Sequence, residues 1–531
     1  MEGHALAVQL LHLQSNSEIY ISLYDHLEAH ASGSSVANML HMQGGEGGVR
    51  EVWNTLYTHY LDQFEQKFSS TYLTNAQFLD SLDHKEEVIE ASKRCLSSLL
   101  GGIGYFEGVP QVNHGVDIHP NNTEFSPLVD LSKSLVARHK LSLYTATPSR
   151  SIFPRGFLWD EGFHQLIIGT WSESIPLNTI QSWLNNLYIF TESRDLLGWI
   201  PREMILGGDA EKRVPGEFIP QRVNIVNPPT FLLLLEHLIT QCKEQCTSES
   251  NKLNKFLVGV YPRLVVWVRG LLVTQGGAEQ GSFRWRGRSQ QDKKFVPNTL
   301  ASGLDDYPRG LFVHYEEKHV DLHCWAMKAV QVVNLIENYL DLPTESRFTH
   351  FDMPARDVTQ LLERKLDEIH WSDEYKGFYD VGVNNESAVF VQEVLFRCGN
   401  PDTRQATDGY IPVYYLQQKI QFCPPSHPQP VSPIGDGQGG YVMRESLQAD
   451  NFTLSHVARV GYTSLFPLLL KLLSPNSPRL ESILATMEDS KQLYTDFGLR
   501  SISASDKFYL KKNSMHDEPY WRYEMCCILL T

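Results

Sequence analysis

The sequence predicts a mainly α-helical protein, in which paired helices form a toroid or solenoid and the loops at one end form a cleft. Three observations lead to this prediction. The chain has 531 residues, 42% of them hydrophobic, which is enough for a large core. Apolar residues recur at helical spacing in many segments, and few strand-like runs separate them. No repeat of fixed length is visible, so a regular TPR or HEAT array is not expected.

The predicted elements follow one another along the chain. Residues 6–24 alternate as β-strands do, and a Gly/Ser-rich stretch follows at 30–48. Apolar residues from Trp53 to Phe68 share one helix face, which predicts that this face packs in a core. Residues 422–440 are rich in Pro and Gly, so we expect an exposed insertion without a regular element. Further helices are predicted at 84–100, 160–170, 176–190, 230–243, 252–274, 320–340, 356–369, 459–473 and 478–490.

Charge and composition exclude several kinds of function. The chain has 46 basic and 62 acidic side chains, a net charge of −16 without a long charged run, so nucleic acid is not an expected partner. The sequence contains no P-loop, dinucleotide fingerprint or GxSxG motif, and no cofactor is predicted. The amino terminus lacks the basic and apolar pattern of a signal peptide, and no run of about 18 apolar residues predicts a membrane span.

Two kinds of covalent modification stay open from the sequence. Cys242 and Cys246 lie four residues apart and can be a helical pair, a disulfide or two free thiols. Sequons at Asn121, Asn385 and Asn451 would accept glycans if the chain met the secretory lumen.

Six segments combine aromatic residues, arginine and carboxylates. Trp needs a partner for its indole N–H, and buried charges need pairing, so packing alone rarely gathers these residues. Together they favour a polyhydroxylated ligand, because carboxylates and Arg bind hydroxyls while an aromatic ring covers the C–H face of a sugar. The segments are Phe153–His164, Gly198–Glu203, Arg284–Arg288, Ser302–Gly310, Glu317–Trp325 and Pro519–Arg522.

Two of these segments suggest particular chemistry. Glycosidic cleavage needs a carboxylic acid to protonate the leaving oxygen, and Asp305 is the candidate, although tandem Asp residues also cap helices and close turns. His319, Asp321 and His323 suggest zinc if they lie on a strand. The following residues have helical spacing, however, and side chains two positions apart on a helix cannot share one ion. No metal site is therefore predicted.

At these segments the sequence resembles glycoside hydrolase family sixty-three, the processing α-glucosidases. The resemblance also includes Leu99–Phe106, Asn227–Thr230, Gly461–Leu473 and Asp496–Ser501. It implies an (α/α)6 toroid at residues 46–531, incomplete at its C-terminus, after a remnant of a β-sandwich and a linker at 1–45. It further implies inverting removal of the distal α-1,2-linked glucose from the Glc3Man9GlcNAc2 N-linked oligosaccharide of nascent glycoproteins, in the endoplasmic reticulum lumen.

The resemblance assigns roles to individual residues. Asp305 falls on the general acid of the family. Lys318 and His323 stand where the family usually has Arg. The positions that the resemblance assigns to substrate binding are Arg155, Trp159, Asp160, Glu161, Arg202, Glu203, Tyr307, Arg309, Glu317, His319, Asp321, Trp325, Trp521 and Arg522.

The chain departs from the family pattern at both ends. It begins inside the expected sandwich, without the anchor, and after Arg522 the residues YEMCCILLT replace the expected continuation. The general base of the family, a Glu in a later FLWEQY-like segment, has no counterpart in these residues. A catalytic acid or base typically contributes about 10²–10⁴-fold, so we expect severely reduced activity. The alternatives are a glycan-binding relative without catalysis and, less favoured, a zinc-dependent hydrolase.

Overall fold

The computed structural model describes most of the chain after the first 45 residues. The contacts divide the chain into two units, Met1–Lys93 and Arg94–Thr531, and each is considered by itself. Helices account for 46% of the described residues, which confirms a mainly helical protein. The described residues are 46–74, 79–80, 82–113, 135–137, 139–192, 195–245, 249–288, 299–305, 307–311, 313–342, 347–348, 351–383, 389–414, 423, 425–435, 440–448, 454–510 and 524–525. The strands predicted at residues 6–24 and the three sequon asparagines lie outside them.

The first unit contains a long helix with a largely uncovered apolar face. Helix α3 (Glu46–Phe68) continues into the π-helical turn η1 (Ser69–Leu73). Phe68 is 2% exposed, but Tyr57 and Tyr60 are 68% and 63% exposed. The prediction of core packing is therefore confirmed for Phe68, whereas no described residue of this unit covers the two tyrosines.

Each further segment predicted as helical contains a helix. The helix predicted at 176–190 is shorter than expected. It ends at Asn185, and a β-hairpin follows it. The helices are α4 (Lys85–Leu100), α6 (Leu158–Trp171), α7 (Ser174–Asn185), α8 (Gly208–Glu211), α9 (Phe231–Gln245), α10 (Glu249–Thr274), α11 (Val320–Tyr339), α12 (Ala355–His370), α14 (Tyr462–Leu469) and α15 (Pro478–Glu488), with 3₁₀ turns η3 (Gly216–Phe218) and η4 (Leu300–Ser302).

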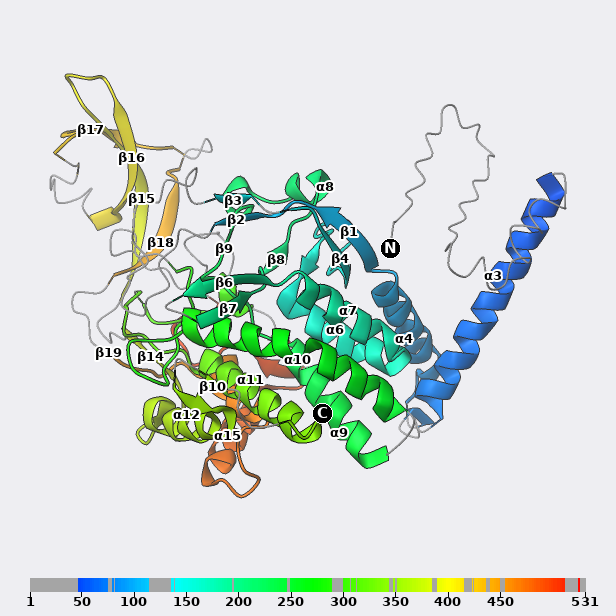
Figure 1. The fold of residues 1–531 in the computed structure, drawn as a ribbon. Coiled ribbons are helices and arrows are strands. Elements are labelled where there is room, and N and C mark those ends of the chain that lie inside the picture. Colours follow the sequence, from blue (N-terminus) through cyan, green and yellow to red (C-terminus); the bar gives the residue numbers. More distant parts are fainter. Residues whose placement is uncertain are drawn as a thin grey trace. The chain divides into compact units, whose positions relative to one another are not determined.

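The contacts between the helices of the second unit arrange them in two layers, and Figure 1 shows α6 beside α7 and α10 beside α11. Helices α6, α9, α11 and α14 contact one another in turn, and α7, α10, α12 and α15 pack against them. Helix α11 lies at the centre: its residues from Val320 to Val330 are all buried, on every face of the helix. A helix that is buried all round belongs to the interior of a large core. The core therefore lies between the two layers, and the loops at the helix ends are left to form a site.

Helix α10 is apolar and long enough, by length and composition alone, to cross a membrane between Lys252 and Thr274, and half of that stretch is buried. It packs against strand β7 (Asp195–Trp199) and the neighbouring helices. At one point the backbones nearly touch, because a Cβ added to Gly270 would lie 1.8 Å from the carbonyl oxygen of Gly198. These contacts are those of a core helix in a folded domain.

Short antiparallel strands connect the helices. β1 (Ile103–Gly108) pairs with β4 (Leu141–Ala146), β6 (Tyr188–Glu192) with β7, β5 (Gly156–Phe157) with β8 (Glu203–Met204), and β14 (Asp380–Val383) with β19 (Leu454–Val457). The remaining short strands are β2 (Gln111–Asn113), β3 (Leu135–Ala137), β9 (Gln221–Arg222), β10 (Arg347–Phe348), β11 (Met353–Pro354), β12 (Trp371–Ser372), β13 (Gly377–Phe378), β20 (Tyr494–Thr495), β21 (Gly498–Arg500) and β22 (Glu524–Met525).

A four-stranded sheet was not predicted. Its long strand β15 (Val389–Gly399) pairs with β16 (Ala406–Pro412), β17 (Gln429–Pro433) and β18 (Met443–Gln448). Strand β17 lies in the Pro-rich stretch expected to lack regular structure, so that prediction is wrong there. The stretch tolerates proline because β17 pairs along one side only, with β15, and an edge strand leaves some N–H groups unpaired.

The structure describes one disulfide and one cysteine of the pair that the sequence left open. A disulfide joins Cys398 of β15 to Cys423. Cys242 is a free thiol, 3.2 Å from the hydroxyl of Tyr339, and Cys246 lies outside the described residues. The two bonded cysteines are 25 positions apart in the sequence. They meet because the fold, and not their spacing, brings the two segments together.

Candidate active site

The first turn of α6 carries three predicted ligand-binding residues, Trp159, Asp160 and Glu161. Glu161 is fully buried, and its Oε1 accepts hydrogen bonds from the backbone N–H of Ala146, at 3.0 Å, and from Gln165 Nε2, at 2.8 Å. A carboxylate in the first turn of a helix is also stabilised by the helix dipole. Glu161 therefore fixes strand β4 to the start of α6 and holds the turn that presents its two neighbours.

Asp160 is the titratable group whose environment is most unusual in this turn. Burial raises its pKa, while the charges of His164 and Arg202 oppose that rise. His164 Nδ1 also lies 3.1 Å from Oε2 of Glu161. A buried carboxyl with a raised pKa beside cationic groups is common at functional sites.

Arg155, Arg202 and Glu203 form one buried cluster. Glu203 Oε2 accepts hydrogen bonds from Arg155 Nε at 2.8 Å and from Arg155 Nη2 at 2.7 Å, and its Oε1 accepts one from Arg202 Nη2 at 2.7 Å. The pairing of β5 with β8 brings the two segments together, since Phe157 lies opposite Glu203. The structure thus joins three side chains that are up to 48 positions apart in the sequence.

The 3₁₀ turn η4, which leads into the Ser302–Gly310 segment, is held by side chains that hydrogen-bond to its backbone carbonyls. Arg202 Nη1 donates to the carbonyl of Leu300 at 3.2 Å, and Asn227 Nδ2 donates to the carbonyl of Ala301 at 2.8 Å. Gly303 then turns with φ +75°, and a Cβ at this position would lie 2.7 Å from Cε2 of Trp159. Glycine is required here twice, for the left-handed backbone and for the contact with the indole ring.

Asp305 follows this turn directly and is partly buried. Its position is fixed by the Gly303 contact on one side and by Tyr307 on the other. Asp306 lies outside the described residues. The structure therefore brings the predicted acid next to the turn that rests on Trp159, and its catalytic role stays a prediction.

Tyr307 is buried and anchors the other side of the turn. Its hydroxyl donates to the carbonyl of Arg459 at 3.2 Å and accepts a hydrogen bond from Thr463 Oγ1 at 3.1 Å. Burial raises its pKa well above the ordinary value, so the hydroxyl keeps its proton and stays a donor. The Tyr307 hydroxyl thus uses its hydrogen bonds on protein groups, and the side chain anchors the turn to Arg459 and Thr463.

Arg309 lies at the centre of a buried ionic cluster. Its Nη1 and Nη2 donate to Asp321 at 2.8 Å and 2.6 Å, and Nη1 also donates to Asp380 at 3.1 Å. Trp285 Nε1 donates to Asp321 Oδ2 at 3.0 Å, and Asp380 Oδ1 accepts from the backbone N–H of Val320 at 2.8 Å. Sequence reasoning identified Arg309 and Asp321 but missed Asp380, which stands in a short strand without any local signal.

Glu317 pairs with a buried arginine of the RWRGR segment. Arg288 Nη1 donates to Glu317 Oε2 at 2.7 Å, and Arg288 Nη2 donates to the carbonyl of Gly310 at 2.7 Å. Both side chains are 1% exposed. Arg288 therefore connects the end of the Ser302–Gly310 segment to the start of the Glu317–Trp325 segment.

Several predicted ligand-binding side chains keep a buried polar atom without a partner. Among the described residues, no hydrogen-bond partner is present for Nη1 of Arg155, Nε of Arg309, Oε1 of Glu317 or Nε1 of Trp325. Buried polar groups are almost always hydrogen-bonded. The Trp325 ring lies edge-on to Trp159 with 6.5 Å between ring centroids. Trp159 lies in the first turn of α6, Trp325 lies in α11, and Arg155 precedes α6. Arg155 and Trp325 each keep one donor that can bind a ligand.

The geometry at His319, Asp321 and His323 does not favour a shared zinc ion. Helix α11 begins at Val320, as the spacing indicated, and the three side chains have separate partners. His319 Nδ1 accepts from the backbone N–H of Trp285 at 2.9 Å, and His323 Nε2 lies 2.8 Å from the carbonyl of Leu362. Within the described ranges, no group of three His, Cys, Asp or Glu side chains is arranged to hold a metal ion.

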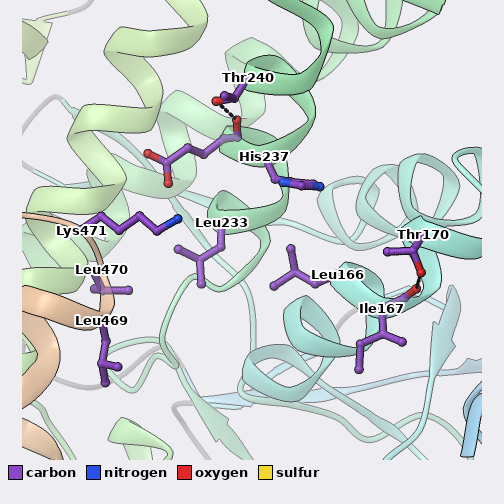
Figure 2. Close-up of a pocket in the computed structure, with 10 residues that line it drawn as sticks. Leu166, Ile167, Thr170, Leu233, His237, Thr240, Leu469, Leu470 and Lys471 are labelled. Carbon is purple, nitrogen blue, oxygen red and sulfur yellow. Dashed lines mark hydrogen bonds between the residues drawn. The ribbon is translucent and has the colours of Figure 1, made fainter. Parts of the chain in front are cut away.

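The predicted contacts at Trp521 and Arg522 lie outside the described residues. A cavity of about 530 Å³, shown in Figure 2, contains none of the predicted site residues. It is lined by the later turns of α6, by α9 and by the end of α14, with Leu166, Leu233 and Leu470 among its apolar contacts. The predicted site residues of α6 lie instead in its first turn, before the part of the helix that lines this cavity.

Comparisons with known proteins give matches over most of the chain. Residues 49–528 match the Glycosyl hydrolase family 63 C-terminal domain. A mannosyl-oligosaccharide glucosidase of Arabidopsis thaliana is 30% identical over 463 residues, which are 87% of this chain and 47% of the relative. A mannosyl-oligosaccharide glucosidase of Saccharomyces cerevisiae is 26% identical over 519 residues, 89% of this chain and 51% of the relative. The chain thus spans about half the length of the curated relatives it matches.

Among solved structures, a family 63 mannosylglycerate hydrolase of Thermus thermophilus in complex with Tris is similar at a TM-score of 0.41 and 11% identity, over 71% of this chain and 79% of the other. A likeness at this level carries no argument about the site.

Proposed function

Because this chain belongs to glycosyl hydrolase family 63, we propose that it contributes the sugar-binding and acid half of an α-glucosidase site. The turn after Gly303 supplies Asp305 as the general acid. Trp159 and Trp325 form an aromatic wall for the glucose ring, and the Arg155–Glu203 cluster binds its hydroxyls. Arg309, Glu317 and Asp321 pair with protein groups, and His319 accepts a backbone hydrogen bond. Their proposed role is therefore to hold the Ser302–Gly310 segment in position.

One observation carries this proposal. Segments far apart in the sequence converge on the indole of Trp159, which contacts Gly303 on one side and Trp325 on another. Beside them, Nη1 of Arg155 and Nε1 of Trp325 are buried and have no hydrogen-bond partner in the described structure. An aromatic face with unused donors next to a carboxyl group is the composition expected for a polyhydroxylated ligand.

The proposed reaction follows from the roles of two carboxyl groups. Asp305 gives its proton to the glycosidic oxygen as the bond to the anomeric carbon breaks, and a water molecule attacks that carbon from the opposite face. In an inverting enzyme a second carboxylate takes the proton of this water, at about 6.5–9.5 Å from the acid. The Glu segment expected for this base has no counterpart in the 531 residues, so we propose that these residues by themselves turn over slowly.

The proposed substrate is the distal α-1,2-linked glucose of Glc3Man9GlcNAc2, in the endoplasmic reticulum, on an (α/α)6 toroid of which the two helix layers are part. The curated relatives named mannosyl-oligosaccharide glucosidase support the substrate class. The two-layer packing of α6 to α15 supports the toroid.

The test compares hydrolysis with binding. Glucose release from Glc3Man9GlcNAc2 is measured for the purified chain and for a longer version that includes a catalytic base. In the longer version, Asp305→Asn is expected to lower turnover by about 10²–10⁴-fold and to leave glycan binding measurable. Retained turnover in Asp305→Asn would remove Asp305 from the acid role. Binding without turnover in both versions would instead favour a glycan-binding relative.

A further inference from the structure

The Asn227–Thr230 segment carries part of the family resemblance, but the proposed function gives it no role. It lies directly before helix α9, and all of its residues are buried. Asn227 is 4% exposed and Thr230 is 0% exposed. Asparagine and threonine lie mostly at protein surfaces, and when they are buried their polar atoms need hydrogen-bond partners inside the protein. The partners of these two side chains show what the segment holds.

Thr230 holds the first turn of helix α6. Its Oγ1 donates to the backbone carbonyl of Trp159 at 2.7 Å. The turn also packs closely on this threonine, because a Cβ added to Gly162 would lie 2.1 Å from Oγ1 and 2.3 Å from Cβ of Thr230. Glycine is unfavourable inside a helix relative to alanine, and here the close approach requires it. Thr230 therefore fixes the backbone that carries the Trp159 indole.

Asn227 holds the turn that leads to the proposed acid. Its Nδ2 donates to the backbone carbonyl of Ala301 at 2.8 Å, although the two residues are 74 positions apart. Ala301 lies in the 3₁₀ turn η4, which is followed by Gly303 and then by Asp305. The amide of Asn227 therefore fixes the start of the segment that carries Asp305.

The backbone between these two side chains is itself restrained. Pro228 and Pro229 each have φ fixed at about −65° by their rings. The backbone N–H of Thr230 donates to the carbonyl of Pro228 at 2.9 Å. Just before the segment, the carbonyl of Ile225 accepts a hydrogen bond from Nε1 of Trp199 at 2.7 Å. A backbone with few free dihedral angles keeps the two donors at a constant separation.

The contacts link three segments of the site in a closed ring. Thr230 holds the backbone of Trp159, and Asn227 holds the backbone of Ala301. Gly303, two positions after Ala301, rests on the indole of Trp159, since its added Cβ would lie 2.7 Å from Cε2 of that ring. Two donors that are three positions apart thus determine how far the turn of the proposed acid lies from the aromatic wall.

We propose that Asn227 and Thr230 are positioning residues of the site. Asn227 holds the turn that presents Asp305 to the glycosidic oxygen, and Thr230 holds the part of the wall that Trp159 forms. This inference rests on the proposed function, because it takes Asp305 as the acid and Trp159 as part of the glucose wall. Loss of the Asn227 donor then impairs proton donation, whereas loss of the Thr230 donor impairs glycan binding.

The first test separates proton donation from the rest of the reaction. It measures turnover of Glc3Man9GlcNAc2 and of α-D-glucosyl fluoride by the longer version that includes a catalytic base. Fluoride leaves without being protonated, so only the glycan needs the acid. Asn227→Leu removes the donor and keeps a side chain of similar size. It is expected to lower glycan turnover about tenfold or more and to keep glucosyl fluoride turnover within about twofold of the parent. Asp305→Asn should show the same selective loss.

The second test measures binding of Glc3Man9GlcNAc2 to the 531-residue chain by tryptophan fluorescence. Thr230→Val removes the hydroxyl and keeps the shape of the side chain, so binding is expected to weaken about tenfold. Thr230→Ser keeps the donor and should bind within about twofold of the parent. Asn227→Leu leaves the wall in place and should also bind like the parent. Thr179→Val is the matched control, because Thr179 is 0% exposed and its hydroxyl has no partner among the described residues.

The outcomes separate this inference from the proposed function. If Asp305→Asn loses glycan turnover selectively but Asn227→Leu lowers both substrates equally or neither, the proposed function stands and the role of Asn227 is refuted. If Thr230→Val binds as tightly as the parent, or Thr230→Ser binds as weakly as Thr230→Val, the role of Thr230 is refuted. If Asp305→Asn affects both substrates equally, the proposed function and this inference fail together.

Discussion

The substitution Gly303→Ala gives a direct test of the convergence on Trp159. Gly303 has φ +75°, and the new methyl group would lie 2.7 Å from Cε2 of the indole. The ring cannot move away easily, because Phe163 and Trp325 stand edge-on to it with centroid separations of 4.9 Å and 6.5 Å. The left-handed backbone costs about 1–2 kcal/mol for a residue with a Cβ, and overpacking costs about 1–3 kcal/mol.

Gly303→Ala is therefore expected to lower the free energy of unfolding by about 2–5 kcal/mol, the two costs together. The measurement is urea unfolding of the 531-residue chain, followed by tryptophan fluorescence. Gly281→Ala is the matched control: its φ is +80°, and the nearest atom to its added Cβ is Cγ of the flexible Lys365 at 3.2 Å. The control should lose about 1–2 kcal/mol, the backbone cost alone. Equal losses in the two variants would mean that Gly303 does not rest on Trp159, and the assembly of the site as described would be wrong.

Three further predictions concern stability. Asp321→Asn removes one buried counter-charge of Arg309 and is expected to lower the free energy of unfolding in urea by about 3–5 kcal/mol. Asp408→Asn, in an exposed pair, should not change the free energy of unfolding measurably. Similar losses in the two variants would contradict the buried cluster. Burial lowers the pKa of His323 to about 4, so the unfolded chain binds more protons than the folded chain below about pH 6.5. The free energy of unfolding should therefore fall as the pH drops from about 6.5 to about 4. If the free energy of unfolding of His323→Gln depends on pH as steeply as that of the parent chain, this prediction is wrong. Reduction of the Cys398–Cys423 disulfide should expose the β15–β18 sheet to limited proteolysis, while the helices keep their far-ultraviolet circular dichroism signal. If the helical signal disappears together with the protease resistance of the sheet, the helical core depends on the sheet and the prediction is wrong.

Helices were predictable because their signal is local. The apolar spacing that predicts α11 is complete within residues 320–340, and the Ser477–Pro478 pair that begins α15 shows a cap and a proline in the first turn. The ends of helices were less certain. The segment after Asn185 keeps apolar residues at helical spacing, yet Tyr188 begins a strand, because its partner β7 lies further along the chain.

The candidate site was predictable as a set of segments and not as a set of contacts. The family resemblance assigned Arg155 and Glu203 to substrate binding, and the structure pairs them. The pairing of Asp380 with Arg309 spans 71 positions, and nothing near Asp380 in the sequence announces it.

The near contact between Gly198 and Gly270 has a consequence for how sequence change spreads through this protein. Gly270 lies on α10, outside the segments of the candidate site, and any side chain there would push strand β7. That strand leads within four residues to Arg202 and Glu203. A substitution at Gly270 would therefore displace the proposed ligand-binding cluster of Arg155, Arg202 and Glu203 without changing any residue of that cluster.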